Sequence, residues 1–556
     1  MIRFGPSWGV LGDLAVMATY TLTSNDGRGH LITLGAKPIT IGRNADNVLP
    51  LPDEMASRYH AVIEPDGNGG YTLKDLGSRN GTRINQTKVT APVPLSPGDV
   101  IKIGGHSFSI EMEQSLGEVR EEARGKTIDA TSQWKAELRS MIENLPPKGE
   151  GADEPVGIID ARGQQSGALT GEADGPAATR LLLLLAGKSR ATDIHIEPKM
   201  EHTSIRMRVD GQMVQISDTP KKVGELVQGL LKAACAMQQA GRDAVQDGHF
   251  SSRFKARRVE YRVSFTPSVH GQKVVIRVLD NANAPKTLTE LGMPPYMLER
   301  IRRTTEKEQG LLLVCGPTGS GKTTTLYNAL KEVDRETSNV VTIEDPVEYQ
   351  LDGVTQIPVD EAKGNTFGGL LRSVLRQDPD VILVGEIRDE ETARTAMQAA
   401  ITGHVVFSTV HAKDTFTATF RLLDLKVEPF LVANALDLVL GQRLCRSLCE
   451  NCKIPVRVPP GLATRMGKWL EGKTETFKAD GCAACLRTGY RGRRAIFELL
   501  DFTDELRDMV IKDPSIANMR RIAEKGLFTT LLQSGWLLAS RGVTSLDEAE
   551  RVAGTG

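Results

Sequence analysis

The segment GPTGSGKTT at residues 316–324 fits the spacing G-x-x-x-x-G-K-[ST] at every fixed position. It follows the apolar run GLLLVC and precedes TTLYNALKEV, so a strand, a loop and a helix are expected in that order. Glycines in such a loop let backbone N–H groups converge on phosphate oxygens, Lys322 reaches the β- and γ-phosphates, and Thr323 ligates Mg²⁺. The predicted phosphate contacts are Gly316, Pro317, Thr318, Gly319, Ser320, Gly321, Lys322, Thr323 and Thr324. The segment therefore predicts a site for ATP with Mg²⁺.

Two acidic clusters follow at the ends of predicted strands. DVILVGEIRD places Glu386 after one apolar run, and VVTIEDPVE places Glu344, Asp345 and Glu348 after another. Because the carboxyl ends of strands border the ligand crevice in an open α/β sheet, both clusters are expected to face the nucleotide. There a carboxylate can hold the Mg²⁺ shell or orient the attacking water, although any one of them can instead belong to a solvated loop.

A third predicted strand is flanked by histidines. TGHVVFSTVHAKD places His404 before the strand and His411 after it. A histidine at this edge can sense the γ-phosphate, and a purely structural role is the alternative.

Four of the seven cysteines form two Cys-x-x-Cys pairs, Cys449 with Cys452 and Cys482 with Cys485. Four thiolates in a tetrahedral arrangement suit structural Zn²⁺, and such a site leaves no open position for catalysis. The 29 residues between the pairs exceed the usual spacing, so a helix around ATRMGKWLEG is expected to bulge out between them. Cys445 is a fifth nearby thiol that we do not expect to be a ligand. An iron–sulfur cluster or plain buried thiols are the alternatives.

A further cluster of polar residues lies near the N-terminus, in ITIGR (39–43), SRYH (57–60) and GSRNGTRIN (77–85). The last segment by itself is typical of a hairpin turn. Taken together, Arg43 can contact a phosphate dianion, Ser57 and Arg58 can add donors, and Asn80 can bind a ligand backbone. His60 and Asn85 are expected to stiffen the loops.

The length and composition bound the elements that must position these residues. A chain of 556 residues suggests three or four folding units. With 69 Lys+Arg against 70 Asp+Glu, no overall field draws the chain to nucleic acid or to an anionic membrane. Seven cysteines are too few for a disulfide scaffold, and the longest apolar run, LLLLLA, is too short to span a membrane. The N-terminal patch WGVLGDLAVM contains an aspartate and does not resemble a signal peptide. We interpret the chain as cytosolic.

The pattern along the chain predicts a multidomain protein. Residues 1–112 alternate short β-like runs with turns, typical of an all-β sandwich, and residues 113–175 are helical and charged and then Pro/Gly-rich, typical of a linker. Residues 176–285 mix a helix with strands in an α+β pattern. Residues 286–556 alternate strands and helices, typical of a mostly parallel α/β sheet, with the cysteine insertion at 445–490 and a helical C-terminus.

The motifs of residues 176–500 closely resemble the type II secretion and type IV pilus assembly ATPases. The resemblance rests on ATDIHIEP, SIRMRVDG, GPTGSGKTTTLYNAL, VVTIEDPVEYQ, LRQDPDVILVGEIRDEETARTAMQAAITGHVVFSTVH and the two CxxC pairs. It implies a homohexameric ring whose chains hold ATP between an α+β N-terminal domain and a RecA-like domain. It also implies peripheral attachment to the inner membrane through a platform protein. Glu348 is then the general base, Glu386 a Mg²⁺ ligand and His411 part of a His box, although spacing alone does not separate the first two roles.

The same resemblance implies that arginines of the N-terminal domain approach the phosphates, where developing charge needs neutralising. The candidates are Arg206, Arg208, Arg262 and Arg277, of which the last three are assigned to catalysis. Alternation along SIRMRVDG places Arg206 and Arg208 on one face, and a solvated face is the alternative. The chain departs from the family pattern at His249, where arginine is usual, and at Gln272, where glutamate is usual. Ala412 and Lys413 also replace a common Thr-Asn pair beside His411.

Residues 18–112 resemble a forkhead-associated (FHA) domain, which reads phosphothreonine. The resemblance implies a phosphothreonine-containing protein as a partner of Arg43, Ser57, Arg58 and Asn80. The sequence therefore predicts a ring-forming ATPase that powers secretion or pilus assembly and recognises phosphothreonine. The alternatives are a phosphothreonine-binding scaffold with a weakly hydrolytic ATPase half, and a nucleic-acid motor. Balanced charge and the lack of aromatic-laced basic stripes disfavour the motor, so no nucleic-acid partner is expected.

Overall fold

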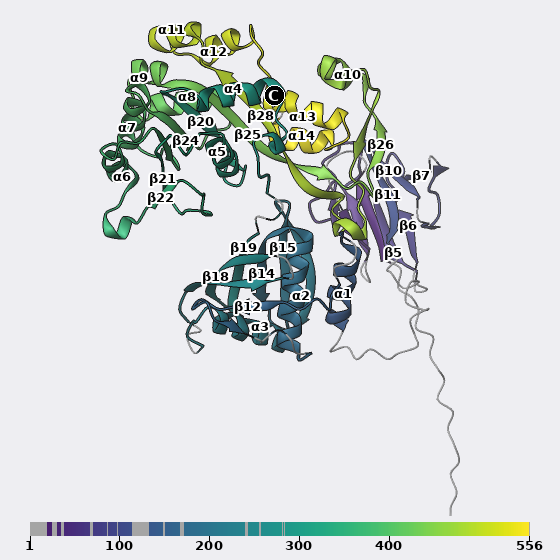
Figure 1. Cartoon of the computed structure of the whole chain (residues 1–556). Coiled ribbons are helices and arrows are strands. Elements are labelled where there is room, and N and C mark those ends of the chain that lie inside the picture. Colours follow the sequence, from purple (N-terminus) through teal and green to yellow (C-terminus); the bar gives the residue numbers. More distant parts are fainter. Residues whose placement is uncertain are drawn as a thin grey trace, which may run out of the picture. The chain divides into compact units, whose positions relative to one another are not determined.

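The computed structural model divides into two compact units, Met1–Asp129 and Ala130–Gly556, each described by itself (Figure 1). The structure describes residues 19–24, 31–34, 38–66, 70–85, 87–96, 98–113, 133–147, 151–166, 169, 172–239, 243–254, 257–280, 282 and 284–554. The apolar N-terminal patch and the charged segment GEVREEARGK (117–126) lie outside the described residues. Among the described helices, none is both long and apolar enough to cross a membrane.

The first unit is a sandwich of two β-sheets, in the strand orders β2-β1-β11-β10-β7-β8 and β4-β3-β5-β6-β9. Its strands are β1 (Thr19–Ser24), β2 (Leu31–Thr33), β3 (Ile39–Gly42), β4 (Leu49–Pro50), β5 (Ala61–Pro65), β6 (Tyr71–Asp75), β7 (Arg83–Ile84), β8 (Thr87–Lys88), β9 (Val93–Pro94), β10 (Val100–Ile103) and β11 (His106–Glu113). The alternation expected for a half-buried strand is clearest in β10, where Ile101 and Ile103 are buried and their neighbours are exposed. The predicted all-β sandwich is confirmed.

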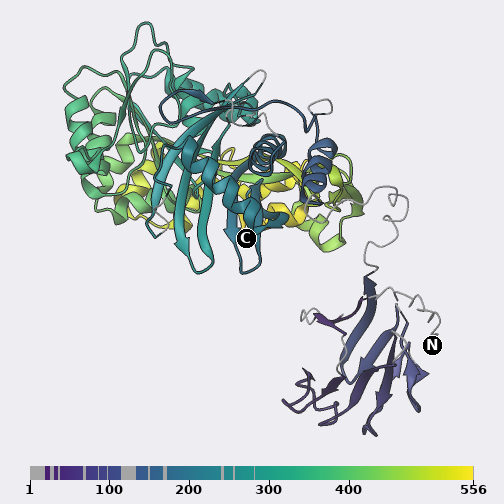
Figure 2. The same ribbon diagram turned by 90° about the horizontal axis from the view of Figure 1, so that it is seen from below.

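The second unit begins with an α+β domain, residues 133–280, built on an eight-stranded antiparallel sheet. The strand order is β13-β12-β17-β18-β19-β14-β15-β16. Its elements are α1 (Gln133–Asn144), β12 (Gly157–Ile159), β13 (Gln165–Ser166), α2 (Asp174–Ser189), β14 (Ala191–Pro198), β15 (His202–Val209), β16 (Gln212–Pro220), α3 (Lys221–Ala234), β17 (Gln246–Arg253), β18 (Arg258–Ser268) and β19 (Gly271–Leu279). Figure 2 shows the long teal strands of this sheet side by side. The apolar residues of α2 and the inward side chains of the sheet share one core.

Part of the segment predicted as linker belongs to this domain. Helix α1 buries Trp134, Leu138 and Ile142, spaced four residues apart on one stripe, in the core of the α+β domain. The buried ammonium of Lys188 donates to the carbonyl of Ile142 at 2.9 Å, and β12 pairs with β17. The linker prediction is therefore wrong for α1 and β12. Their few apolar side chains pack only against segments that lie far away in the sequence.

The remaining residues, 284–554, form a RecA-like domain on a seven-stranded sheet in the order β22-β21-β23-β24-β20-β25-β28. All neighbouring pairs are parallel except β25 with β28. The two faces of the sheet are covered by separate apolar cores, which explains why β20 and β24 are buried at every residue. The predicted α/β sheet is confirmed.

The elements of this domain follow in chain order. They are α4 (Pro295–Thr305), β20 (Gly310–Cys315), α5 (Lys322–Leu330), β21 (Val340–Glu344), β22 (Thr355–Pro358), α6 (Phe367–Val374), β23 (Val381–Val384), α7 (Glu390–Ile401), β24 (Val405–Val410), α8 (Thr415–Asp424), α9 (Pro429–Ala435), β25 (Leu436–Leu448), β26 (Ile454–Arg457), α10 (Pro460–Met466), β27 (Glu475–Lys478), β28 (Tyr490–Asp501), α11 (Asp504–Lys512), α12 (Ile516–Ala523), α13 (Leu531–Ser540) and α14 (Leu546–Ala553). Helix α10 and the hairpin β26–β27 lie between the two cysteine pairs, as the long spacing predicted.

Candidate functional site

The loop between β20 and α5 has the backbone of a phosphate cradle. Gly316 has φ 155° and Gly321 φ 87°, both positive. A Cβ at Gly316 would lie 2.4 Å from the carbonyl oxygen of Gln442, so no other residue fits there. Helix α5 begins at Lys322 without a side-chain cap, which leaves its first N–H groups available to an anion.

A cavity of about 530 Å³ lies in front of this loop. Its polar lining includes the predicted residues Thr318, Gly319, Gly321, Lys322, Thr323, Thr324, Glu344, Asp345, Glu348, Glu386 and His411. The ends of β21, β23 and β24 thus bring both acidic clusters and one histidine to the loop. Gly316, Pro317 and Ser320 belong to the loop but do not line the cavity. Hydroxyl and carboxylate oxygens are the ligands that Mg²⁺ prefers, so the residues present fit a nucleotide with Mg²⁺.

Lys322 is held by its own loop. Its Nζ donates to the carbonyl oxygens of Gly316 at 3.0 Å and Pro317 at 3.2 Å. Partial burial lowers the pKa of Lys322, and the charge of Glu386 opposes that shift. The ammonium therefore lies preorganised beside the position where phosphates would sit.

Glu386, two residues after β23, lies beside two basic side chains. Arg388 forms an ion pair with it, and the Nε2 of His411 lies 3.4 Å from its carboxylate. Arg388 also lies 3.8 Å from Asp345. Arg388 was not predicted, although its place two residues after Glu386 in GEIRD is a local signal.

The three carboxylates of the β21 cluster differ in environment. Glu344 is buried, 3 % exposed, and accepts hydrogen bonds from Tyr327, Thr342 and Gln356. Asp345 and Glu348 are exposed to the cavity. Only these two are therefore free to meet the nucleotide, its metal or the attacking water.

Several other predicted residues do not reach this cavity. His404 lies at the opposite end of β24, with its Nδ1 3.1 Å from the carbonyl oxygen of Ala399. The predicted arginines lie on the open face of the α+β sheet, and Leu279 is the one residue of that domain found in the described cavity lining. Arg206, Arg208, Arg262 and Arg277 therefore do not line this cavity, and their approach to the phosphates stays a prediction.

The arginines instead form a cross-strand row. In register across β17, β18, β19, β14 and β15 lie His249, Arg262, Arg277, Asp193 and Arg208. Asp193 lies 3.5 Å from Arg277 and 3.7 Å from Arg208. Arg262, Arg277 and His249 line an open depression of about 540 Å³.

Arg206 lies on the same face as Arg208, as alternation predicted, but it donates to Glu197 at 2.7 Å. Gln272, the other departure from the family pattern in this domain, is buried.

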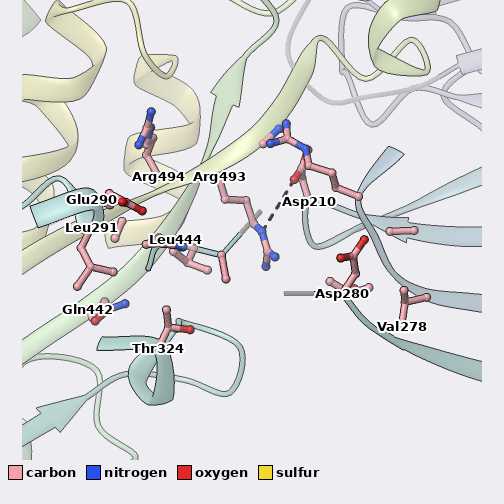
Figure 3. A pocket seen from close by; sticks show the side chains of 18 of the residues that line it. Asp210, Val278, Asp280, Glu290, Leu291, Thr324, Gln442, Leu444, Arg493 and Arg494 are labelled. Atoms are coloured by element: carbon pink, nitrogen blue, oxygen red, sulfur yellow. Dashed lines mark hydrogen bonds and ion pairs between the residues drawn. The ribbon is translucent and has the colours of Figure 1, made fainter. Parts of the chain in front are cut away.

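A second cavity, of about 300 Å³, shares Gly321 and Thr324 with the first (Figure 3). Its lining combines apolar groups, among them Leu291 and Leu444, with the charged Asp280 and Arg493. The dashed line in Figure 3 marks the ion pair of Arg493 with Asp210, 3.9 Å. Apolar walls with a few polar groups are typical of ligand pockets, and this one adjoins the phosphate loop at Gly321 and Thr324.

The four predicted zinc ligands converge. The sulfurs of Cys449, Cys452, Cys482 and Cys485 all lie within 4.8 Å of one another. Three of the pairs are 3.8–3.9 Å apart, close to the roughly 3.8 Å edge of a tetrahedron with Zn–S bonds of about 2.3 Å. Cys445 is buried and lies outside the cluster. The donor set fits a structural Zn²⁺, which would cross-link the two knuckles.

The predicted phosphopeptide residues lie on neighbouring loops of the first unit. The N–H of Arg43 donates to the carbonyl of Ser57 at 2.9 Å, and the N–H of Arg79 donates to the Ser57 Oγ at 3.1 Å. Arg43, Arg58 and Arg79 are exposed and form no ion pair with any carboxylate in the described part of the chain. Arg79 was not predicted, although it stands inside the GSRNG motif.

These loops are braced from within. Asn80 donates to the carbonyl of Met55 at 2.7 Å, and the N–H of Ser57 donates to His60 Nδ1 at 3.0 Å. Asp75 accepts from Ser78 and Thr82, and although burial acts to raise the pKa of Asp75, these bonds lower it to about 2. Asn85 donates to Asp99 at 2.6 Å, consistent with the bracing role expected of it.

Known protein families match both the N-terminal and the C-terminal part of the chain. A family model described as "Type II/IV secretion system protein" matches residues 178–551, and one described as "FHA domain" matches residues 39–104. The Type II secretion system protein HxcR of Pseudomonas aeruginosa is 40% identical over 90% of this chain and 98% of its own length. The Type II secretion system ATPase E of Vibrio cholerae is 35% identical over 90% and 96%.

A solved structure shows the same fold. The ATPase DotB of Legionella pneumophila is similar with a TM-score of 0.52 at 20% identity, over 68% of this chain and 95% of DotB. With a phosphate loop, the carboxylates at its strand ends and a family model that matches most of its length, the chain belongs to the Type II/IV secretion system family and is a P-loop ATPase of that family with an N-terminal FHA domain.

Proposed function

We propose that the chain forms a homohexameric ring that converts ATP hydrolysis into movement of an inner-membrane platform protein of a secretion or pilus system, while its FHA domain binds a phosphothreonine-containing protein. The observation that carries the motor half is the meeting of Lys322, Thr323, Glu348 and Glu386 in one cavity. The ring works from the cytoplasm and meets the membrane only through partners.

The roles follow from position. Lys322 and the N–H groups of α5 hold the phosphates. Thr323 and Glu386 would hold Mg²⁺, which would supply positive charge beside the transferred phosphoryl. Glu348, exposed in the same cavity, orients the attacking water. The row of Arg208, Arg262 and Arg277 reaches a nucleotide only after the α+β domain moves or through another chain of the ring.

The motor half is tested with Lys322→Ala in the full chain. We expect ATP turnover to be lost while the far-UV circular dichroism spectrum is unchanged. Lys363→Ala is the matched control, because Lys363 is exposed and pairs with Asp360 outside the cavity. Undiminished hydrolysis by Lys322→Ala contradicts the assignment.

The FHA half is tested by titrating the full chain with a phosphothreonine peptide and its unphosphorylated twin. Arg43→Ala removes a charge-assisted bond, which typically contributes about 1.5–3 kcal/mol, so affinity should fall by roughly tenfold or more. Arg83→Ala, which changes an exposed side chain on β7, is the control. Equal affinity for both peptides means that the site is inert.

Two alternatives make different predictions. A scaffold with a weakly hydrolytic ATPase half predicts little or no steady-state turnover by the purified ring. A nucleic-acid motor predicts strong, salt-dependent stimulation by DNA. Mass photometry with a non-hydrolysable ATP analogue tests the hexamer directly, and a monomer under all conditions excludes the ring.

A further inference from the structure

The buried Tyr327 connects the nucleotide helix to the loop that carries Glu348. Tyr327 lies on α5, five residues after Lys322, and is fully buried. Its hydroxyl donates a hydrogen bond to the Oε2 of Glu344. The same oxygen accepts a hydrogen bond from the backbone N–H of Glu348, with an N···O distance of 3.4 Å. One phenol oxygen therefore joins α5 to both ends of the segment between Glu344 and Glu348.

The other oxygen of Glu344 is held as firmly. Thr342 donates to its Oε1 at 2.5 Å and Gln356 at 3.1 Å. The same Gln356 amide donates to the carbonyl of Tyr349 at 3.1 Å. Burying a carboxylate costs free energy unless hydrogen-bond donors satisfy it. The network of donors around Glu344 therefore favours a single conformation of the segment from Glu344 to Glu348.

The ring of Tyr327 adds a packing contact. Tyr349, the residue after Glu348, lies edge-on to Tyr327 with centroids 4.7 Å apart and an interplanar angle of 77°. Burial and the charge of Glu344 raise the pKa of Tyr327, so its hydroxyl stays protonated and remains a donor at working pH.

We propose that Tyr327 and Glu344 form a latch that fixes the main chain of Glu348 relative to the phosphate loop, so that Tyr327 is a positioning residue for activation of the attacking water. In this role Glu344 acts through its hydrogen bond with the Tyr327 hydroxyl. The latch rests on the proposed assignment of Glu348 as the general base.

The test compares Tyr327→Phe, Glu348→Gln and the double variant in the full chain. Displacements of about 1 Å in a catalytic group cost up to about 100-fold, so Tyr327→Phe should lower kcat at least about tenfold. KM and the Kd for a fluorescent ADP analogue should stay within about twofold. In the double variant the loss should equal that of Glu348→Gln alone, because Tyr327 acts only through Glu348.

Tyr296→Phe is the matched control, since it removes a partly buried hydroxyl that contacts Thr529, and neither residue lines the cavity. An unchanged kcat in Tyr327→Phe overturns the latch, and so does a loss that appears only in KM or Kd. Multiplicative losses in the double variant overturn the route through Glu348. Should Tyr327→Phe not fold, Gln356→Ala weakens the same network from β22 and should give the same split between kcat and KM.

The two proposals fail in distinguishable ways. Full activity of Glu348→Gln contradicts the assignment of Glu348 as the general base, and the latch proposal fails with it. An inactive Glu348→Gln beside a fully active Tyr327→Phe leaves the base in place and removes the latch alone.

Discussion

Gln442 ties the phosphate loop to a strand that lies more than a hundred residues away in the sequence. It is 2 % exposed on β25, donates to the carbonyl of Ser320 at 2.9 Å and accepts from the Thr325 hydroxyl at 2.7 Å. Replacing it by leucine keeps the approximate size of the side chain and removes both bonds. The Gln442→Leu variant therefore tests whether this strand preorganises the loop.

The magnitude follows from the two bonds. Each contributes about 0.5–1.5 kcal/mol, and a buried carbonyl left without a donor costs about 1–3 kcal/mol. After the substitution the Thr325 hydroxyl can donate to the carbonyl of Gly321 in its own helix, so only the Ser320 carbonyl loses its donor. We therefore take a total loss of about 2 kcal/mol, near the low end of the summed contributions. If that energy is lost from the conformation that binds phosphates, the Kd for ATP rises by roughly 30-fold.

The assay is equilibrium binding of a fluorescent ATP analogue to the full chain, with Gln398→Leu on the exposed side of α7 as the control. The expected result is weaker binding by Gln442→Leu with an unchanged circular dichroism spectrum. Binding within about twofold of the unmodified chain refutes the argument, because the loop would then hold its shape without β25.

Three further predictions concern stability and metal. Cys449→Ser should release about one zinc ion per chain, measured by elemental analysis after dialysis, because three thiolates leave the tetrahedral site incomplete. Glu548→Gln should destabilise the RecA-like domain by about 3–5 kcal/mol in denaturant titrations, because Arg446 loses the fully buried carboxylate that pairs with it at 2.7 Å. Asp75, with its pKa lowered from 3.8 to about 2, stabilises the FHA domain above about pH 4, and this contribution is lost as the pH falls towards 2. Asp75→Asn should remove that acid dependence, seen by circular dichroism against pH, and an unchanged slope would point to other carboxylates.

Local motifs were predictable from the sequence because their chemistry is contained in a few consecutive residues. The phosphate loop needs glycines at fixed positions and a lysine at the start of a helix, and all of these lie within residues 316–324. The cysteine pairs and the GSRNG loop are equally local. The apolar runs GLLLVC and VVFSTV predicted a buried parallel sheet, because a strand with both faces in the core needs apolar side chains at every position.

The environment of each carboxylate was not predictable. Glu344, Asp345 and Glu348 are near neighbours in one acidic cluster, yet only Glu344 is buried and fully hydrogen-bonded. Its donors Tyr327 and Gln356 come from a helix and a strand whose approach depends on the packing of the whole sheet. The segment 133–166 was predicted as a linker for a similar reason, since its packing partners also come from distant parts of the chain.

The sequence by itself determined which chemistry the chain holds: a phosphate cradle, acidic groups at strand ends, a four-thiolate cluster and a second set of phosphate-binding residues in a β-sandwich. Only the tertiary structure decided which of these groups meet. It placed Glu348, Glu386 and His411 at the loop, left His404 and the arginine row away from it, and supplied Gln442 from 117 residues beyond Thr325. The physical reason is that backbone conformation is set within a few residues, whereas burial and partnership depend on strand order and register, which no local spacing encodes.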